Sequence, residues 1–221
     1  MLTLAFDTSS SRLSVALLSD KKILAKNTIY ESGKQSELLI PEIEKILKEN
    51  KIWYQDLDLI AATNGPGSFT GVRVGLTVAR TLKACLQSFP LILVNSCEVV
   101  AFKYQKKSGR IFVLLDASMG EFFCAEFFAE NGVVREVLKP QLVGMEELLK
   151  ILPKENFFLC GSGKKFVMQS GVSFETSEED DAIEADFVGL LAYEKFQQGE
   201  KNSADLNPIY LRSPRIEKRK K

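Results

Sequence analysis

The sequence predicts an α/β fold made of two similar halves, each with the element order βββαβα, that pack with a cleft between them. The first observation is an internal repeat, because residues 4–16 can be laid over residues 113–125 at a constant offset of 109 without a gap. The second is that an apolar strand ends in an aspartate in both copies, at Asp7 and Asp116, before a small-residue turn and an alternating strand. The third is that each copy continues with a helical pattern and a strand that ends in a glycine-containing turn.

The first half continues with a third strand over residues 23–29 and a helix over 36–49. Apolar side chains in this helix recur three and four residues apart, which places them on one inward face. A buried strand over 57–63 then leads into a glycine-rich turn, and a second helical pattern follows over 70–87. The inward face of the first helix consists of Leu39, Ile43, Ile46 and Leu47.

The second half repeats this order with shorter elements. A third strand is expected over 133–138, a helix over 145–152, and a strand with a glycine turn over 157–163. The halves are joined near residues 97–110, where lysines, a serine and a glycine indicate a polar connector. A last helix is expected over 182–196.

Composition excludes several classes of function. The 221 residues carry 29 basic and 29 acidic side chains, so the whole chain is no electrostatic match for nucleic acid. Histidine is absent, which removes Ser-His-Asp and Cys-His catalysis and metal ligation by imidazole. The four cysteines form no CxxC pair, so we expect buried, reduced thiols of a cytoplasmic protein and no metal site. No apolar run approaches the roughly 18 residues of a membrane span, and no membrane partner is expected.

The most informative segment is Asn64 to Leu76, which places four glycines between the buried strand and the second helix. Backbone N–H groups at such a turn can receive an anion at the start of the helix. A tight turn that needs positive φ is the alternative, and spacing alone does not decide between them. The segment lacks the Lys-Ser/Thr ending of a P-loop and does not follow the dinucleotide GxGxxG pattern.

Gly71, Gly75 and Ala79 recur every four residues and form a smooth stripe along the second helix. Each glycine inside a helix costs about 1 kcal/mol relative to alanine, so a close approach of another element should offset that cost. Either the chain's own core or a partner subunit can supply that element.

The duplicated layout, with an aspartate at the first turn of each half, resembles the actin-like ATPase and sugar-kinase superfamily, which has a ribonuclease H-like fold. In that superfamily nucleotide binds between the lobes. Five stretches together look like the bacterial TsaB family, also called YeaZ, and 65–75, which reads GPGSFTGVRVG, is the most specific of them. The resemblance covers residues 2–212 and rests on the stretches 7–9, 64–75, 116–121, 161–163 and 210–212.

The resemblance also implies how the chain divides. In the superfamily the last helix crosses back to pack on the first lobe. We therefore expect a first lobe of residues 1–100 and 182–212, a second lobe of 101–181, and a basic tail of 213–221.

The resemblance implies a noncatalytic subunit rather than an enzyme. TsaB proteins are paralogues of TsaD, which transfers a threonylcarbamoyl group to tRNA and holds its metal through histidines that this chain does not have. The expected partners are a TsaD-like paralogue in a heterodimer, a TsaE-like P-loop ATPase, tRNA indirectly through the complex, and a second copy when the chain is alone. Many family members have a histidine where this chain has Gln35, which leaves that residue's contribution in doubt.

The family pairs with its enzyme through the two helices of the first lobe. On this interpretation the glycine stripe faces the partner. The expected interface residues are Ser36, Leu39, Gly71, Val72, Gly75, Leu76, Ala79 and Leu82.

An alternative function is nucleotide binding or ATP hydrolysis in the cleft, with Asp7 and Asp116 holding Mg²⁺ through water. A turn-forming role, in which each aspartate bonds its own backbone, remains open. No cofactor is required by the leading interpretation, and weak ATP or ADP binding stays open. The candidate phosphate-binding residues are Asp7, Thr8, Ser9, Asp116, Gly161 and Gly163. A peptidase, the third alternative, has no nucleophile–base pair to support it.

Three charged features complete the expectations. Arg73, early in the second helix, opposes the helix dipole and is expected to serve an acidic partner or a core-side ion pair. The acidic run 178–181 is expected to be solvated and to supply negative charge at the start of the last helix. Residues 215–221 are either a frayed basic end or a contact for tRNA phosphate.

Overall fold

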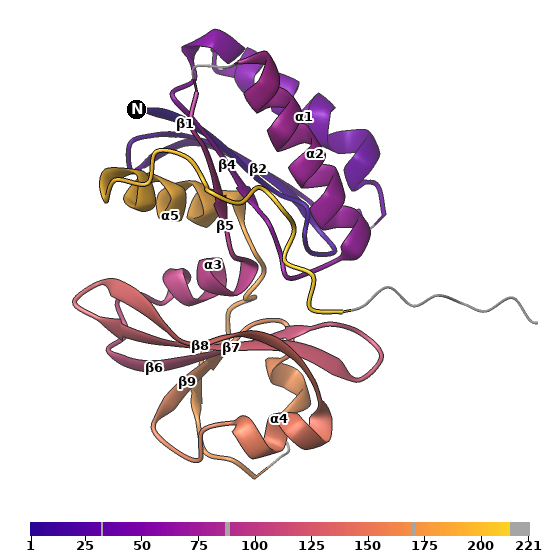
Figure 1. Cartoon of the computed structure of the whole chain (residues 1–221), viewed down its shortest axis with the longest axis vertical. Helices are drawn as coiled ribbons and strands as arrows, with labels where there is room; N and C mark the ends of the chain where they lie inside the picture. The colour runs from indigo at the N-terminus through magenta and orange to yellow at the C-terminus, as the bar shows by residue number, and fades with distance from the viewer. Residues whose placement is uncertain (32, 87–88, 169–170, 213–221) are drawn as a thin grey trace, which may run out of the picture.

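Two five-stranded mixed sheets, one in each lobe, are stacked along the long axis of the molecule (Figure 1). The computed structural model describes residues 1–31, 33–86, 89–168 and 171–212. The expected basic tail 213–221, with its proposed tRNA contact, lies outside the described residues. Among the described residues, no helix combines the length and apolarity needed to cross a membrane.

The first sheet has the order β3-β2-β1-β4-β5 and the second the order β10-β9-β6-β7-β8. Read from the opposite edge, the second order repeats the first, and the strand directions also correspond. The duplication expected from the sequence is therefore confirmed at the level of topology. The strands are β1 (Leu2–Asp7), β2 (Leu13–Ser19), β3 (Lys22–Ile29), β4 (Leu59–Thr63), β5 (Leu91–Val94), β6 (Gly109–Asp116), β7 (Glu121–Glu130), β8 (Val133–Gly144), β9 (Phe157–Cys160) and β10 (Glu175–Thr176).

The two hairpins differ by one residue, so the ungapped repeat is correct for the first strand only. Phe6 pairs with Val15 in the first hairpin, whereas Leu115, its equivalent at the offset of 109, pairs with Phe123. The turn after Asp116 is one residue shorter than the turn after Asp7, and every later residue of β7 is shifted by one. Strand pairing fixes this register, and a gapless overlay of the two sequences does not reveal it.

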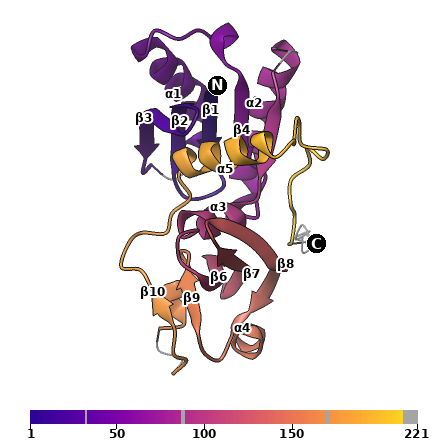
Figure 2. The same ribbon diagram turned by 90° about the vertical axis from the view of Figure 1, so that its left-hand side faces the viewer.

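Helices and sheets alternate in layers, because successive side chains of a strand point to opposite faces. α1 and α2 cover the outer face of the first sheet, α5 and α3 lie between the two sheets, and α4 covers the outer face of the second (Figures 1 and 2). The inward face predicted for α1 is confirmed, with the same four buried residues. The helices are α1 (Gln35–Glu49), α2 (Phe69–Cys85), α3 (Ser96–Lys103), α4 (Met145–Ile151) and α5 (Ala185–Gln197), with short 3₁₀ turns at Tyr54–Asp56 and Lys164–Phe166.

The polar connector expected near 97–110 is wrong for its first part, which forms the buried helix α3. Val99, Val100 and Phe102 are at most 3% exposed and pack between the two sheets. Of the residues that suggested a connector, Lys106, Lys107 and Ser108 lie in the short loop after the helix, whereas Lys103 ends α3 and Gly109 begins β6. α5 returns to the first lobe as expected and lies on β1 and β2, where a Cβ at Gly189 would stand 2.5 Å from Leu18 Cδ1.

The glycine stripe of α2 faces the interior of the first lobe, which corrects the expectation that it faces a partner. A Cβ at Gly71 would lie 1.9 Å from the carbonyl oxygen of Thr8, and one at Gly75 would lie 2.5 Å from Thr8 Oγ1. Ala79 is fully buried. The glycines therefore allow α2 to approach the turn after β1, so the chain's own core supplies the close contact. Val72 and Leu76 are buried with the stripe, at 2% exposure each.

Candidate functional site

A cleft of about 1090 Å³ lies between the lobes. Its walls are the turn after β1, the start of α2, the turn after β6 and the C-terminal segment 209–212. Of the six residues expected to bind phosphate, Ser9 and Asp116 line this cleft and the other four lie behind its walls. The structure thus places the turns after β1 and β6 beside the same cleft, but of the expected residues only Ser9 in the first turn and Asp116 in the second line it.

Asp7 uses its carboxylate to close the first turn. It is 1% exposed and accepts hydrogen bonds from Ser9 N at 3.1 Å, from Ser9 Oγ at 2.6 Å and from Thr63 Oγ1. Burial raises the pKa of Asp7 above its usual value, and the hydroxyl and amide donors oppose that shift. Thr8 is also used internally, because its Oγ1 donates to the carbonyl of Gly71 at 2.7 Å.

Asp116 makes the equivalent turn but is exposed at the cleft. Its Oδ1 accepts from Ser118 N at 2.8 Å, just as Asp7 accepts from Ser9 N. Both aspartates therefore bond the amide two residues ahead, which is the turn-forming role. The backbone amide of Asp116 donates to Ser162 Oγ at 3.0 Å and joins the two turns of the second lobe.

Gly161 and Gly163 pack against the second lobe instead of opening toward the cleft. Gly161 N donates to Asp181 Oδ2 at 2.9 Å, and Gly163 N donates to the carbonyl of Leu114 at 2.8 Å. A Cβ at Gly161 would lie 2.3 Å from that carbonyl oxygen. Close backbone contact explains both glycines, and their amides are already paired.

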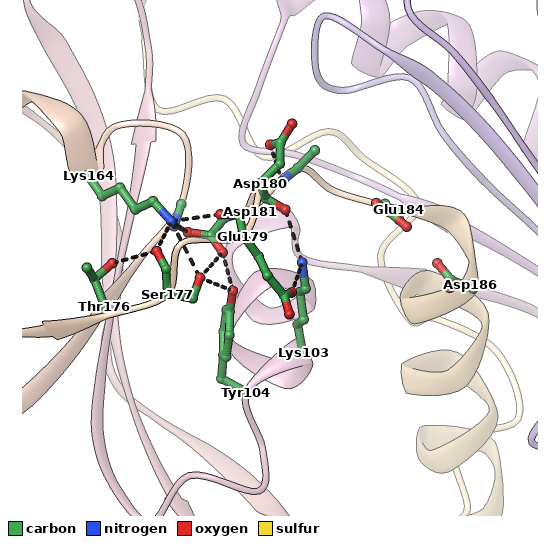
Figure 3. A network of polar contacts seen from close by, with 12 residues as sticks. Lys103, Tyr104, Lys164, Thr176, Ser177, Glu179, Asp180, Asp181, Glu184 and Asp186 are labelled. Carbon is green, nitrogen blue, oxygen red and sulfur yellow. Dashed lines mark hydrogen bonds and ion pairs between the residues drawn. The ribbon is translucent and has the colours of Figure 1, made fainter.

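A buried polar network surrounds Asp181 on the way from the second lobe to α5 (Figure 3). Its carboxylate pairs with Lys164 Nζ at 2.7 Å and accepts from the Tyr104 hydroxyl and from Ser177 Oγ. Burial, followed by the bond to Asp181, raises the pKa of Tyr104. Lys164 Nζ also donates to the carbonyls of Ser177 and Glu179 at 2.8 and 2.9 Å.

Four other carboxylates of this crossing segment, residues 177–186, also have basic partners. The expectation of a solvated acidic run is confirmed for Glu178, Glu179 and Asp180, which are exposed, and is wrong for Asp181, which is buried. Arg12 binds Asp180, and Lys103 lies 3.1 Å from a carboxylate oxygen of Glu179. Lys26 contacts both Glu184 and Asp186, and α5 begins only at Ala185. Basic side chains from both lobes contact this segment. The sequence alone does not show which lysines and arginines of the chain lie close to it in the fold.

The outward face of α1 and α2 carries a second hollow, a groove of about 420 Å³. Of the residues expected at a partner interface, Ser36 lines this groove, Leu82 is half-buried and Leu39 is fully buried. The sequence pointed to Ser36 and Arg73 but not to the other groove residues, because the smooth stripe that it favoured lies on the opposite side of α2. The groove is lined by Ser36, Phe69, Thr70, Arg73, Val74, Thr77 and Val78.

Gln35, at the position where relatives were expected to have histidine, joins α1 to the turn after β1. Its Nε2 donates to the carbonyl of Ser10 at 3.2 Å. Among the described residues, no group of three or more Cys, Asp or Glu side chains is arranged to hold a metal ion, and the chain has no histidine.

Comparison with known proteins decides the family. Residues 29–194 match the family model described as TsaD, tRNA N6-adenosine threonylcarbamoyltransferase. A Bacillus subtilis relative described as tRNA threonylcarbamoyladenosine biosynthesis protein TsaB is 32% identical over 156 residues, which cover 71% of this chain and 68% of that relative. The chain belongs to the TsaB family, also called YeaZ. The TsaB-type fold is also seen in YeaZ from Pseudomonas aeruginosa, with a TM-score of 0.83 at 25% identity over 95% of this chain and 99% of that one.

A more distant likeness extends the fold beyond TsaB. The ROK hexokinase of Thermus thermophilus gives a TM-score of 0.51 at 12% identity and covers 90% of this chain and 100% of that one. At this identity the likeness concerns the fold alone. It agrees with the duplicated, two-lobed α/β fold of the actin-like and sugar-kinase type expected from the sequence.

Proposed function

We infer that this TsaB-family chain is a noncatalytic subunit that binds a TsaD-like transferase and supports formation of threonylcarbamoyladenosine in tRNA. The observation that carries the noncatalytic role is the state of the cleft turns. The Asp7 carboxylate and the Gly161 and Gly163 amides form hydrogen bonds within the chain, although these residues occupy positions that would face a phosphate in a nucleotide-binding relative. The absence of histidine removes the metal ligands that the resemblance assigns to the enzyme.

The surface that we assign to the partner is the groove on the outward face of α1 and α2. Phe69 and Ile40 on this face are 44% and 42% exposed. Exposed aromatic and aliphatic side chains around a hollow are typical of a protein interface. The assignment keeps the two helices of the original interpretation but replaces the buried stripe by the opposite side of α2.

Light scattering after size-exclusion chromatography tests this function directly. We expect the chain and the TsaD-like protein of the same organism to elute as a one-to-one heterodimer. Thr77→Trp, at an exposed groove position, should prevent that complex while the monomer stays folded. Val137→Trp on β8 is the control, because Val137 is 60% exposed in the other lobe. A heterodimer that forms equally well with Thr77→Trp would refute the groove, and failure of the unmodified chain to bind would refute the function.

A second candidate, nucleotide binding, is favoured by the interlobe cleft, whose volume of about 1090 Å³ lies just above the usual range of small-molecule sites and leaves room for a nucleotide. Titration calorimetry with ATP and ADP tests it, and Asp116→Asn is the informative variant because Asp116 lines the cleft. Heat of binding that Asp116→Asn removes would support a nucleotide site.

The leading proposal includes further partners. A TsaE-like ATPase joins the complex of this chain with the TsaD-like transferase, and this complex binds tRNA in the cytoplasm. When the chain is alone, it forms a homodimer.

A further inference from the structure

Helix α2 carries positive charge that no carboxylate of the described residues neutralises. Its residues include Arg73, Arg80 and Lys83 but no aspartate or glutamate. Within the described ranges, none of these three cations lies within ion-pair distance of a carboxylate, although thirteen other basic groups do. Their hydrogen bonds go to neutral acceptors, among them a hydroxyl group and two backbone carbonyls, which carry no balancing negative charge.

The C-terminal segment, residues 202–212, supplies most of these neutral acceptors. It leaves α5, pairs along the edge strand β5 and runs past α2 toward the second lobe (Figures 1 and 2). Arg80 donates to the carbonyl of Leu206, and Arg73 Nε donates to the hydroxyl of Tyr210 at 2.7 Å. The segment therefore lies beside the outward face of α2.

Phe69, Arg73 and Tyr210 form a stack at the start of α2. The guanidinium carbon of Arg73 lies 3.8 Å from the centroid of the Phe69 ring, and the Phe69 and Tyr210 rings are 5.1 Å apart. Both rings are 44% exposed. Aromatic and arginine side chains are the residue types that carry most binding energy at protein interfaces, and here two of them also line the groove.

Arg212, two residues after Tyr210, anchors this end of the C-terminal segment to the second lobe. Its guanidinium binds the Glu121 carboxylate at 2.5 Å and the carbonyl of Ala117 at 2.9 Å. Both acceptors belong to the hairpin of β6 and β7, so the position of Tyr210 is tied to the second lobe. Arg212 is a positioning residue for the stack and makes no contact with the groove itself.

We propose that α2 and the C-terminal segment together form a basic, aromatic docking face, and that its occupant is an acidic patch on the TsaD-like subunit. This inference rests on the proposed function and adds the chemistry of the contact. Covering cations with a surface that offers no carboxylate would be costly, because their hydration would be lost without compensation. A second copy of this chain would bind the face less tightly, because a two-fold symmetric homodimer would place the same cations of both copies near one another.

Calorimetry of the heterodimer at low and moderate salt tests the charge of the face. We expect Arg73→Gln and Arg80→Gln to weaken binding by about tenfold each, and the affinity to depend less steeply on salt than with the unmodified chain. Tyr210→Ala should weaken binding by about tenfold through the lost ring. Arg135→Gln is the matched control, because Arg135 on β8 is exposed and pairs with no carboxylate of the described residues. It should leave both the affinity and its salt dependence unchanged.

Arg212→Ala separates positioning from direct contact. It should weaken the heterodimer less than Tyr210→Ala does, and it should speed hydrogen exchange of the C-terminal segment in the free chain. Tyr210→Ala combined with Arg212→Ala should then be no weaker than Tyr210→Ala alone. Additive losses would show that Arg212 acts by another route and would overturn its positioning role.

The outcomes distinguish this inference from the proposed function. Unchanged affinity and salt dependence in Arg73→Gln and Arg80→Gln, together with loss of binding in Thr77→Trp, would overturn the acidic occupant and leave the function standing. Weakened self-association with an unchanged heterodimer would show that the occupant is a second copy. No heterodimer with the unmodified chain would overturn both.

Discussion

At the scale of single residues, α2 depends on glycines where an added methyl group has no room. Thr8 Oγ1 stands 2.5 Å from the place of a Cβ on Gly75, and it is held there by its bond to the carbonyl of Gly71. The cost of glycine in a helix, about 1 kcal/mol, is therefore offset by contact with the turn after β1. The same argument means that a large side chain at Gly75 tests folding and does not test partner binding.

Gly75→Ala should lower the free energy of unfolding by about 1–3 kcal/mol, because the overlap with Thr8 outweighs the gain in helix propensity. Urea denaturation measures this change. The double variant Gly75→Ala, Thr8→Ala removes the overlapping hydroxyl and should recover part of the loss. A single variant more stable than the unmodified chain would contradict the packing that the structure shows.

Asp7 predicts a dependence of stability on pH. Burial raises the pKa of Asp7 in the folded chain above 3.8, so folding favours the protonated form. The contribution of Asp7 is thus fully present below that value and is lost as pH rises through the folded pKa. Relative to Asp7→Asn, which has no such titration, the unmodified chain should lose stability over this window. Denaturation curves at several pH values check the sign, and a relative gain would refute it.

At the scale of elements, the crossing segment 177–186 holds α5 to both lobes through ion pairs of very different burial. Asp181 is 3% exposed and accepts hydrogen bonds from Tyr104, which follows α3, from the turn after β9 and from Lys164. Asp180 next to it faces solvent and binds Arg12 of the first lobe. The two neighbours therefore provide a matched comparison between a buried and an exposed pair.

Asp181→Ala should lower the free energy of unfolding by about 3–5 kcal/mol, since it leaves the Lys164 ammonium without its buried partner. Asp180→Ala, one residue away, should cost about 0–1 kcal/mol because exposed pairs contribute little. Urea denaturation of both variants measures the difference. Equal losses would show that the burial of Asp181 does not determine its role.

At the scale of the whole molecule, the two lobes share the hydrophobic cluster that lies between their sheets, and each lobe has a further cluster on the outer face of its own sheet. Residues of β1, α3, α5, β6 and β7 belong to a single buried cluster, and α3 lies in its middle. Two lobes with separate cores would be expected to move and unfold independently. Here the shared cluster should couple them.

Native-state hydrogen exchange should therefore give β1 and β6 the same free energy of opening. Phe102→Ala, which removes a 3% exposed ring of α3 from the shared cluster, should lower both values together by about 3–5 kcal/mol. Exchange of β6 amides at a clearly lower free energy than β1 amides would show that the second lobe opens by itself.

The sequence by itself determined the duplicated α/β fold, most element positions and the inward face of α1. These follow from periodicity, from turn residues and from the repeat of an aspartate after each first strand, all of which act over a few residues. The resemblance to the TsaB family rested on segments such as 65–75, whose residues are unusual enough to identify the family locally.

Tertiary structure alone decided which surfaces are exposed and which charges are unpaired. The sequence shows that Gly71, Gly75 and Ala79 share a stripe, but only the position of Thr8 shows that the stripe is buried. It shows that the crossing segment 177–186 is acidic, but only the fold brings Arg12, Lys26, Lys103 and Lys164 to this segment from four distant places. Burial and pairing are set by residues far apart in the chain, and no local pattern encodes which of them meet.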